Sequence, residues 1–272
     1  MGGPLGVFDS GFGGLTIFKG IRSQIPEYDF LYLGDNARTP YGNRSFETVL
    51  AFSIEAVNYL LKSGCPLVVV ACNTASAKAL RTIQQNWLPK HFPDRRVLGV
   101  IRPTAEAVSN FTKTKKVGLW ATTGTVKSGS FPIEIEKLAP GVQVFQQACP
   151  LLVPLVEAGE LDGEGLHHFI QKYWRLTMAQ CGDIDTLLLA CTHYPLIYNE
   201  IRKIIPESVR IVSQDKIIPP SLVDYLSRHP EIDSRLAKNG TAQFLTTEEE
   251  SFFNQLAGVF LGESVRSQKV VL

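Results

Sequence analysis

The chain repeats one pattern, in which a short apolar run leads into a polar turn and then into a segment whose apolar residues recur at helical spacing. Two of the apolar runs end in Ala-Cys followed by small polar residues, at residues 66–74 and 185–193. A strand that is apolar throughout is typical of a parallel sheet covered by helices on both faces. We therefore predict an α/β fold with mainly parallel sheets flanked by helices.

The order of these runs indicates an internal duplication. A strand with a glycine-rich turn, a second strand and a strand ending in Cys are expected at residues 5–14, 30–33 and 66–72. The same order returns at residues 116–125, 142–145 and 185–191, after a period of about 110–120 residues. We expect two domains of similar topology with the active site in the cleft between them. The domains are predicted to comprise residues 1–95 with 207–272, and residues 96–206.

Local signals define the ends of two helices and one unusual loop. Ser45 is expected to cap a helix that reaches Lys62 and stops at Gly64. Thr247, followed by Glu250, resembles a capping box at the start of the last helix. The tail after residue 206 is expected to pack against the first domain. Residues 34–44 form a loop too long for a simple connector, and such loops are often functional.

Composition narrows the class of protein. The 272 residues include 44% hydrophobic and 19% charged side chains, so a large buried core is expected and disorder is not. The net charge is +1 without a strongly basic block, which gives no indication of nucleic-acid binding. The five cysteines lack the density of a disulfide scaffold, and neither a signal-like start nor an apolar run of membrane length is apparent. We expect a protein of the reducing cytoplasm without a membrane partner.

Cys72 and Cys191 carry the candidate chemistry. Both follow strands whose carboxyl ends form the ligand crevice of α/β folds, and both precede segments expected to be helical. A helix N-terminus favours negative charge, so it is expected to lower the pKa of a thiol below about 8.5 and to attract a carboxylate. Two such groups on opposite faces of one carbon can invert a stereocentre, one as thiolate and the other as thiol. Nearby hydroxyl and amide groups could bind carboxylate and ammonium: Ser10, Asn73, Thr74, Thr125 and Thr192.

Each of these residues also has a simpler interpretation. A cysteine beside a buried strand is usually a small hydrophobic residue, although two such residues would have to coincide with a repeated Ala-Cys turn. Asp9 can be an ordinary turn residue. His193 can be structural instead of an acid, a base or an orienting partner. Glu157 can be a solvated carboxylate at a helix end. The remaining cysteines are assigned to packing: Cys65, Cys149 and Cys181.

Other classes of protein lack residues that they need. A phosphatase with a cysteine nucleophile needs Arg six residues after the Cys, where this chain has Lys78 and Ile197. A zinc site needs several Cys or His ligands at close spacing, whereas Cys191 and His193 offer two at most. Residues 124–129 lack the spacing of a phosphate-binding P-loop. A non-catalytic two-domain protein that binds an acidic metabolite remains an open alternative.

Four segments together resemble the glutamate racemases. Their sequences are GVFDSGFGGLT, PYG, ACNTASA and CTHYPL, at residues 6–16, 40–42, 71–77 and 191–196. The resemblance implies a racemase that interconverts L- and D-glutamate without PLP, another cofactor or a metal, and that supplies D-glutamate for peptidoglycan. The form of the last segment favours glutamate over the related aspartate racemases. A homodimer is compatible with the resemblance, but the sequence itself indicates no oligomeric state.

The resemblance also implies roles for individual residues. Cys72 would act on D-glutamate and Cys191 on L-glutamate, with Asp9 and His193 as further catalytic residues and Glu157 as their support. The residues implied to contact the substrate are Asp9, Ser10, Tyr41, Gly42, Asn73, Thr74, Thr125, Thr192 and His193.

The chain departs from the family pattern at three places. Phe12 replaces a smaller residue, Phe131 stands where Tyr is common, and residues 212–215 match the family's late segment imperfectly. These departures leave the chemistry intact and concern the surroundings of the site and the tail.

Overall fold

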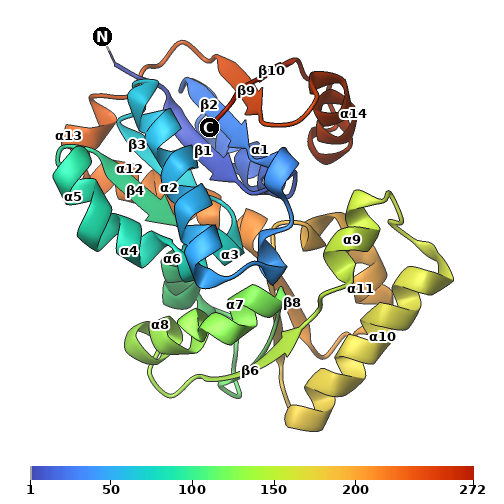
Figure 1. Cartoon of the computed structure of the whole chain (residues 1–272). Coiled ribbons are helices and arrows are strands. Elements are labelled where there is room, and N and C mark those ends of the chain that lie inside the picture. The colour runs from blue at the N-terminus through green and yellow to red at the C-terminus, as the bar shows by residue number, and fades with distance from the viewer. Residues whose placement is uncertain (1) are drawn as a thin grey trace.

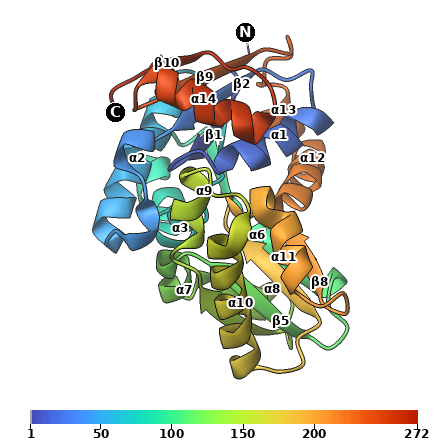
Figure 2. The ribbon, with the colours of Figure 1, turned by 90° about the vertical axis from the view of Figure 1, so that its right-hand side faces the viewer.

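The computed structural model describes residues 2–272 and contains two sheets of parallel strands. One sheet lies in the upper part of the molecule and the other in the lower part (Figure 1, Figure 2). The upper sheet has six strands, in the order β10 (Ser267–Lys269), β9 (Ala242–Thr246), β2 (Phe30–Gly34), β1 (Leu5–Asp9), β3 (Leu67–Val70) and β4 (Arg96–Gly99). The lower sheet has four strands, in the order β6 (Gln143–Ala148), β5 (Lys116–Ala121), β7 (Thr186–Ala190) and β8 (Arg210–Ser213).

The two sheets share one strand order. In the upper sheet β2–β1–β3–β4 follow one another, and in the lower sheet β6–β5–β7–β8 do so. The cysteine strands β3 and β7 therefore occupy equivalent positions, each beside the first strand of its unit. In each unit the chain passes to one side of that first strand and then to the other, which creates the switch point where α/β folds bind ligands. The predicted fold class is confirmed.

The limits of the two predicted domains, 1–95 with 207–272 and 96–206, remain a prediction. Strand pairing favours slightly later limits at both junctions. β4 pairs with β3 in the upper sheet, and β8 pairs with β7 in the lower sheet.

Helices cover both faces of the upper sheet because its strands alternate their buried side chains. Val7 and Tyr32 pack with Phe18 of α1 (Gly14–Gln24), whereas Phe8 and Leu33 belong to the core formed with α2 (Phe46–Lys62). The remaining α-helices are α3 (Asn73–Lys78), α4 (Leu80–Thr82), α5 (Leu88–His91), α6 (Ile101–Ala107), α7 (Thr123–Ser128), α8 (Ser130–Leu138), α9 (Leu152–Glu157), α10 (Gly163–Gln180), α11 (Tyr198–Ile204), α12 (Ile218–Arg228), α13 (Pro230–Asp233) and α14 (Glu250–Leu261).

Short helical turns connect several of these elements. They are the 3₁₀ turns η1 (Asn36–Arg38), η2 (Tyr41–Asn43), η4 (Val108–Asn110), η5 (Tyr194–Ile197) and η6 (Gln214–Lys216), and the π-helical turn η3 (Ile83–Trp87). Two of them, η1 and η2, lie within the loop 34–44. The loop is therefore structured, and it is not an extended connector.

The tail after β8 returns to the upper sheet, as predicted. β9 pairs with β2, and β10 pairs with β9, so the last strands extend that sheet on the side opposite β3. Figure 2 shows α14 beside these strands, over the same part of the molecule as α1. Among residues 2–272, no helix has the length and apolar composition required to cross a lipid bilayer.

One of the two helix caps predicted from the sequence is confirmed. Ser45 is the N-cap of α2, and its Oγ accepts a hydrogen bond from the Thr48 N–H at 3.2 Å. The capping box at Thr247 is wrong, because α14 begins at Glu250 after a Glu249 N-cap that makes no side-chain cap. The Thr247 hydroxyl is instead held by the loop 34–44, where it donates to Asp35 Oδ1 at 2.9 Å.

The Ser45 cap predicts a measurable stability effect. Ser45→Ala leaves the Thr48 N–H without its side-chain partner, so we expect a loss of about 1 kcal/mol in the free energy of unfolding. Urea unfolding measures this loss. The matched control is Ser23→Ala within α1, where the exposed hydroxyl donates only to the Gly20 carbonyl and makes no cap. Equal stability of the two variants would contradict the assignment.

Candidate active site

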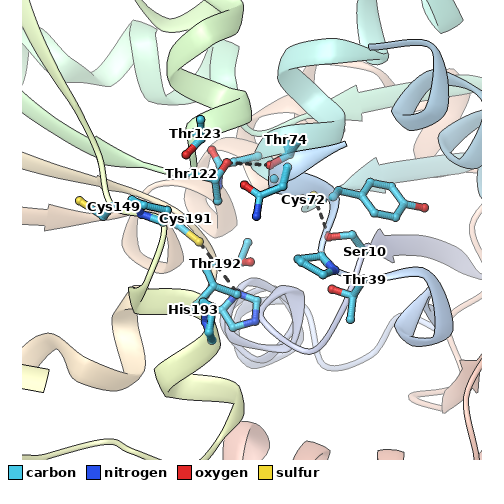
Figure 3. A pocket seen from close by; sticks show the side chains of 18 residues that line it. Ser10, Thr39, Cys72, Thr74, Thr122, Thr123, Cys149, Cys191, Thr192 and His193 are labelled. Carbon is cyan, nitrogen blue, oxygen red and sulfur yellow. Dashed lines mark hydrogen bonds between the residues drawn. The ribbon is translucent and has the colours of Figure 1, made fainter. Parts of the chain in front are cut away.

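A pocket lies between the carboxyl ends of the two sheets, and residues from both units line it. Figure 3 shows Cys72 and Ser10 on one side and Cys191 on the opposite side. Both thiols are buried, with Cys72 5% and Cys191 6% exposed. The structure therefore brings the two cysteines that the sequence singled out to one pocket.

Most of the residues expected from the sequence line this pocket. They are Ser10, Tyr41, Gly42, Cys72, Asn73, Thr74, Cys191, Thr192 and His193. Asp9, Thr125 and Glu157 do not line it, although Thr125 and Glu157 are hydrogen-bonded to the lining residues Thr122 and His193. Pocket residues that the sequence analysis did not assign to the substrate include Thr39, Asn43, Thr122, Thr123, Cys149 and Val153. The sequence could have indicated four of these residues by their position beside recognised motifs. Thr39 and Asn43 flank the PYG segment, and Thr122 and Thr123 precede Thr125.

Cys72 is the N-cap of α3, and its surroundings keep it protonated. Its Sγ accepts from the Ala75 N–H at 3.4 Å and shares a hydrogen bond with the Ser10 hydroxyl at 3.1 Å. Burial, together with the nearby Asp9 carboxylate, raises the pKa of the Cys72 thiol to about 12. The expectation of a lowered pKa at this helix terminus is wrong for this conformation, because desolvation outweighs the local hydrogen bonds.

Cys191 follows β7, and a histidine stands beside it in place of a helix N-terminus. Its Sγ lies 3.9 Å from His193 Nδ1, and His193 Nε2 lies 2.9 Å from Glu157 Oε1. Burial lowers the pKa of His193, but the hydrogen bonds to Cys191 and Glu157 outweigh it and raise the pKa to about 10. The imidazole is therefore a cation at neutral pH and donates to both partners. Cys191 thus has a positively charged hydrogen-bond donor as its neighbour.

Asp9 does not line the pocket, but it is close enough to Cys72 and His193 for its charge to act on both. Its Oδ2 accepts from the Gly11 N–H at 3.0 Å, while its Oδ1 has no hydrogen-bond partner. Burial raises the pKa of Asp9, and the charge of His193 opposes that shift. The side chain is 1% exposed and is not among the residues that line the pocket.

A cluster of threonine hydroxyls joins the two units at the pocket. Thr74 Oγ1 lies 2.9 Å from Thr122 Oγ1, which in turn lies 3.1 Å from Thr125 Oγ1 (Figure 3 shows the first pair). Thr16 Oγ1 of α1 also donates to the Thr192 carbonyl at 2.9 Å. Of these residues Thr74 and Thr122 line the pocket, where their hydroxyls could donate to an anionic group.

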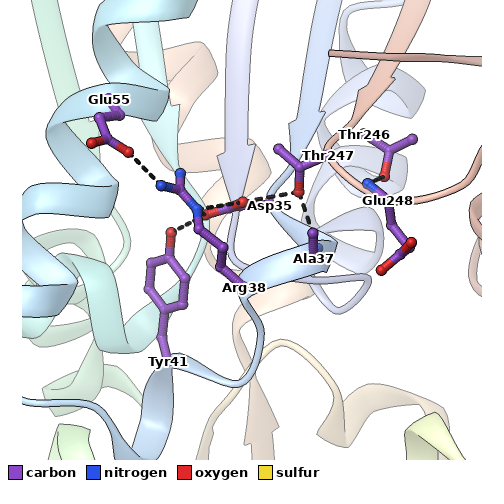
Figure 4. A network of polar contacts seen from close by, with 8 residues as sticks. All are labelled: Asp35, Ala37, Arg38, Tyr41, Glu55, Thr246, Thr247 and Glu248. Carbon is purple, nitrogen blue, oxygen red and sulfur yellow. Dashed lines mark hydrogen bonds and ion pairs between the residues drawn. The ribbon is translucent and has the colours of Figure 1, made fainter. Parts of the chain in front are cut away.

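A buried carboxylate holds the loop 34–44 that brings Tyr41 and Gly42 to the pocket. Asp35, which is fully buried, accepts hydrogen bonds from Arg38 Nε at 2.7 Å and from the Tyr41 and Thr247 hydroxyls (Figure 4). Burial and the neighbouring Asp35 raise the pKa of Tyr41, so its hydroxyl stays protonated and donates. The tail thus helps to position a loop that lines the site.

Gly13 marks the closest approach between the two halves. A Cβ at this position would lie 2.2 Å from Thr192 Oγ1 and 2.4 Å from His193 Nδ1. Gly13 is therefore required because the turn after β1 packs directly on the turn after β7. Among residues 2–272, no group of three or more His, Cys, Asp or Glu side chains is arranged to hold a metal ion.

The fold and pocket define a class of protein, namely a duplicated α/β protein whose ligand site lies between equivalent strand ends. Residues 15–216 match the model of the Asp/Glu/hydantoin racemase family. The chain is 38% identical over 270 residues to a glutamate racemase from Sulfurihydrogenibium, covering 99% of this chain and 97% of that protein. A glutamate racemase from Aquifex aeolicus is 38% identical over 261 residues, 96% of this chain and 95% of that protein. The chain belongs to the Asp/Glu/hydantoin racemase family, and the resemblance to glutamate racemases is confirmed.

Solved structures agree with this assignment. Glutamate racemase isoform RacE1 from Bacillus anthracis superposes with a TM-score of 0.89 at 35% identity, covering 99% of this chain and 98% of that chain. The enzyme from Francisella tularensis, solved in complex with D-glutamate, superposes with a TM-score of 0.87 at 30% identity and the same coverage. The aspartate racemase of Picrophilus torridus shares the fold at 18% identity and a TM-score of 0.54.

The close approach at Gly13 predicts that a single methyl group destabilises the protein. In Gly13→Ala the new methyl group forces the side chains of Thr192 and His193 away from residue 13. We therefore expect a loss of about 1–3 kcal/mol in the free energy of unfolding. The control is Gly165→Ala, because a Cβ at Gly165 meets no atom within 4 Å. Urea unfolding compares the two. A Gly13→Ala variant as stable as Gly165→Ala would contradict the packing.

The Glu157–His193 pair predicts a pH dependence of stability. The pKa of His193 is about 10 in the folded protein and 6.5 ordinarily, so the imidazolium stabilises the fold fully below about pH 6.5. That contribution is lost as the pH rises through about 10. We expect the stability difference between the wild type and Glu157→Gln to shrink over this range, as measured by urea unfolding. Glu160→Gln, at an exposed carboxylate, is the control. A Glu157→Gln difference that stays constant with pH would argue against a charged His193.

Proposed function

We propose that this protein interconverts L- and D-glutamate by proton transfer between the substrate α-carbon and two cysteine thiols. The observation that carries the proposal is the position of Cys72 and Cys191 on opposite sides of one pocket, after equivalent strands. Inversion of a carbon centre requires a base on one face and an acid on the other. The relatives named as glutamate racemases, and the complex of one of them with D-glutamate, support glutamate as the substrate.

The two thiols have different neighbours, which suit them to different steps of the proposed reaction. The Cys72 thiol has a pKa of about 12, and Cys191 lies next to the His193 cation. In the direction from L- to D-glutamate, Cys191 acts as the thiolate that takes the α-proton of L-glutamate and becomes a thiol. The Cys72 thiol then gives its proton to the opposite face of the carbanion and becomes a thiolate, which yields D-glutamate. The reverse reaction uses the same groups in the opposite order.

The neighbouring residues have supporting roles in this proposal. The charge of Asp9 favours the protonated Cys72, and Ser10 holds its sulfur by a hydrogen bond. Glu157 keeps His193 protonated and oriented toward Cys191. Tyr41, Gly42, Asn73, Thr74 and Thr192 would bind the carboxylates and ammonium of the substrate, and Thr125 would act through the threonine cluster.

Substrate entry requires the halves to separate. The cavity has a volume of about 50 Å³, whereas benzene occupies an engineered cavity of about 150 Å³. Glutamate has more non-hydrogen atoms than benzene, so it cannot enter the cavity as it stands. Reclosure over the substrate would expel water and strengthen the action of a thiolate on a weak carbon acid.

The wider setting is also part of the proposal. We infer that the protein works in the cytoplasm, without a cofactor, and that its D-glutamate is used for peptidoglycan. The five cysteines are all free in the structure, which fits a reducing compartment. A homodimer is proposed only from the resemblance to the family, and size-exclusion chromatography with light scattering tests it.

The two-thiol reaction predicts solvent isotope incorporation. L-Glutamate incubated with the protein in deuterated water, without added PLP, should gain deuterium at the α-carbon as D-glutamate appears. Cys72→Ser and Cys191→Ser should each lower kcat/KM by a factor of about 10²–10⁴, the usual contribution of a positioned acid or base. Proton NMR and chiral chromatography follow both changes.

Cys181→Ser is the matched control, because Cys181 lies outside the pocket and its thiol bonds only to Asp183. Full racemase activity in Cys72→Ser would contradict the two-thiol mechanism. Stabilisation of the protein by glutamate without α-proton exchange would favour the alternative, a non-catalytic protein that binds an acidic metabolite.

A further inference from the structure

Gln214 is a buried residue outside the pocket that links both halves of the molecule. It begins η6, directly after β8, and is 1% exposed. Its Oε1 accepts a hydrogen bond from Asn73 Nδ2 at 2.6 Å, and its Nε2 donates to Thr104 Oγ1 at 3.0 Å. Gln214 belongs to the segment 212–215, one of the places where the sequence departs from the family pattern. This segment therefore contains a side chain that contacts a pocket residue.

The direction of this hydrogen-bond chain is fixed at its far end. The Val100 carbonyl can only accept, and the Thr104 hydroxyl donates to it at 2.6 Å. Because the proton of Thr104 is used there, its oxygen can only accept from Gln214. The Gln214 amide must then direct its Nε2 toward Thr104 and Val100, which leaves its Oε1 toward Asn73.

This direction determines which end of the Asn73 amide is used. Asn73 must offer its Nδ2 to Gln214, because two amide oxygens cannot bond to each other. Its Oδ1 is then the free end, and that oxygen is buried without any hydrogen-bond partner. Asn73 lines the pocket and is 3% exposed. A buried acceptor without a partner in a ligand pocket calls for a donor from the ligand.

We propose that Gln214 is a positioning residue that locks the Asn73 amide with its oxygen available to the substrate ammonium. This inference rests on the proposed function and deepens it, since it assigns one pocket group to one group of an amino-acid substrate. The threonine hydroxyls can donate hydrogen bonds to the substrate carboxylates. The substrate ammonium needs an acceptor instead, and Asn73 Oδ1 supplies one if the amide is held so that it cannot turn its Nδ2 toward the substrate. It favours an amino acid over a dicarboxylate that lacks the ammonium group.

The test compares glutamate with glutarate, the dicarboxylate without an ammonium group. Gln214→Leu frees the Asn73 amide to rotate, so KM for L- and D-glutamate should rise by about tenfold or more while kcat changes by less than about threefold. The inhibition constant of glutarate should stay within about threefold of the wild-type value.

A second variant and a control distinguish a specific effect on substrate binding from a folding defect. Thr104→Val removes the hydroxyl that orients Gln214 without touching the pocket, so it should raise KM in the same direction but by less. Gln84→Leu is the control, because Gln84 Nε2 donates to the Val97 carbonyl at 2.7 Å and lies outside the pocket. Its kinetics should match the wild type. If Gln214→Leu does not fold, Thr104→Val decides the question.

The outcomes separate this inference from the proposed function. If the wild-type protein does not exchange the α-proton of glutamate, the proposed function itself is wrong. Active wild type with unchanged KM in Gln214→Leu, or in Thr104→Val where the first variant does not fold, would overturn only the role of Gln214. Equal weakening of glutamate and glutarate would also overturn it, because a merely structural residue would affect both ligands alike.

Discussion

The pocket depends on the contact between two turns, the glycine-rich turn after β1 and the turn that carries Thr192 and His193. At Gly13 the backbone of one turn meets the side chains of the other with no space for a methyl group. Thr16, in the first turn of α1, donates to the Thr192 carbonyl and fixes the same contact. Because each turn follows a strand of a different sheet, this contact sets how far the two cysteine strands stand apart.

The two thiols of the duplicated fold differ in the charged residues beside them. Cys72 and Cys191 follow equivalent strands, yet only Cys191 has a histidine two residues later. Asp9, from the turn that packs against His193, adds negative charge near Cys72. The duplication therefore provides equivalent positions for the two cysteines, and the sequence differences between its copies give them different neighbours. An acid and a base are both needed at once, so symmetry in sequence would have worked against the proposed reaction.

Sequence patterns were sufficient for the fold and for most of the pocket, since fully apolar strands and repeated turns carry strong local signals. They failed where a distant partner decides the outcome. Thr247 has the sequence spacing of a helix cap, but its hydroxyl donates to Asp35 in the loop 34–44 instead. Cys72 has the helix N-terminus that should lower its pKa, but the burial that reverses this shift comes from the whole fold. The segment 212–215 drew notice only as an imperfect match, and the proposed role of Gln214 could not be read from it, because that role depends on Asn73 and Thr104, which are far from it in sequence.

Phe12, the departure within the glycine-rich turn, has a structural reason in the tail. Its ring stacks on Phe253 and Phe260 of α14, with centroids 5.6 and 6.1 Å apart. Phe260 in turn meets the His193 ring edge to face at 5.8 Å. A larger residue at position 12 thus fills the space between α14 and the site, and it keeps water from one side of the imidazolium. Since burial opposes the charge of His193, this apolar wall makes the hydrogen bonds to Glu157 and Cys191 more necessary. The tail therefore affects the candidate chemistry through the desolvation of His193, although none of its residues lines the pocket.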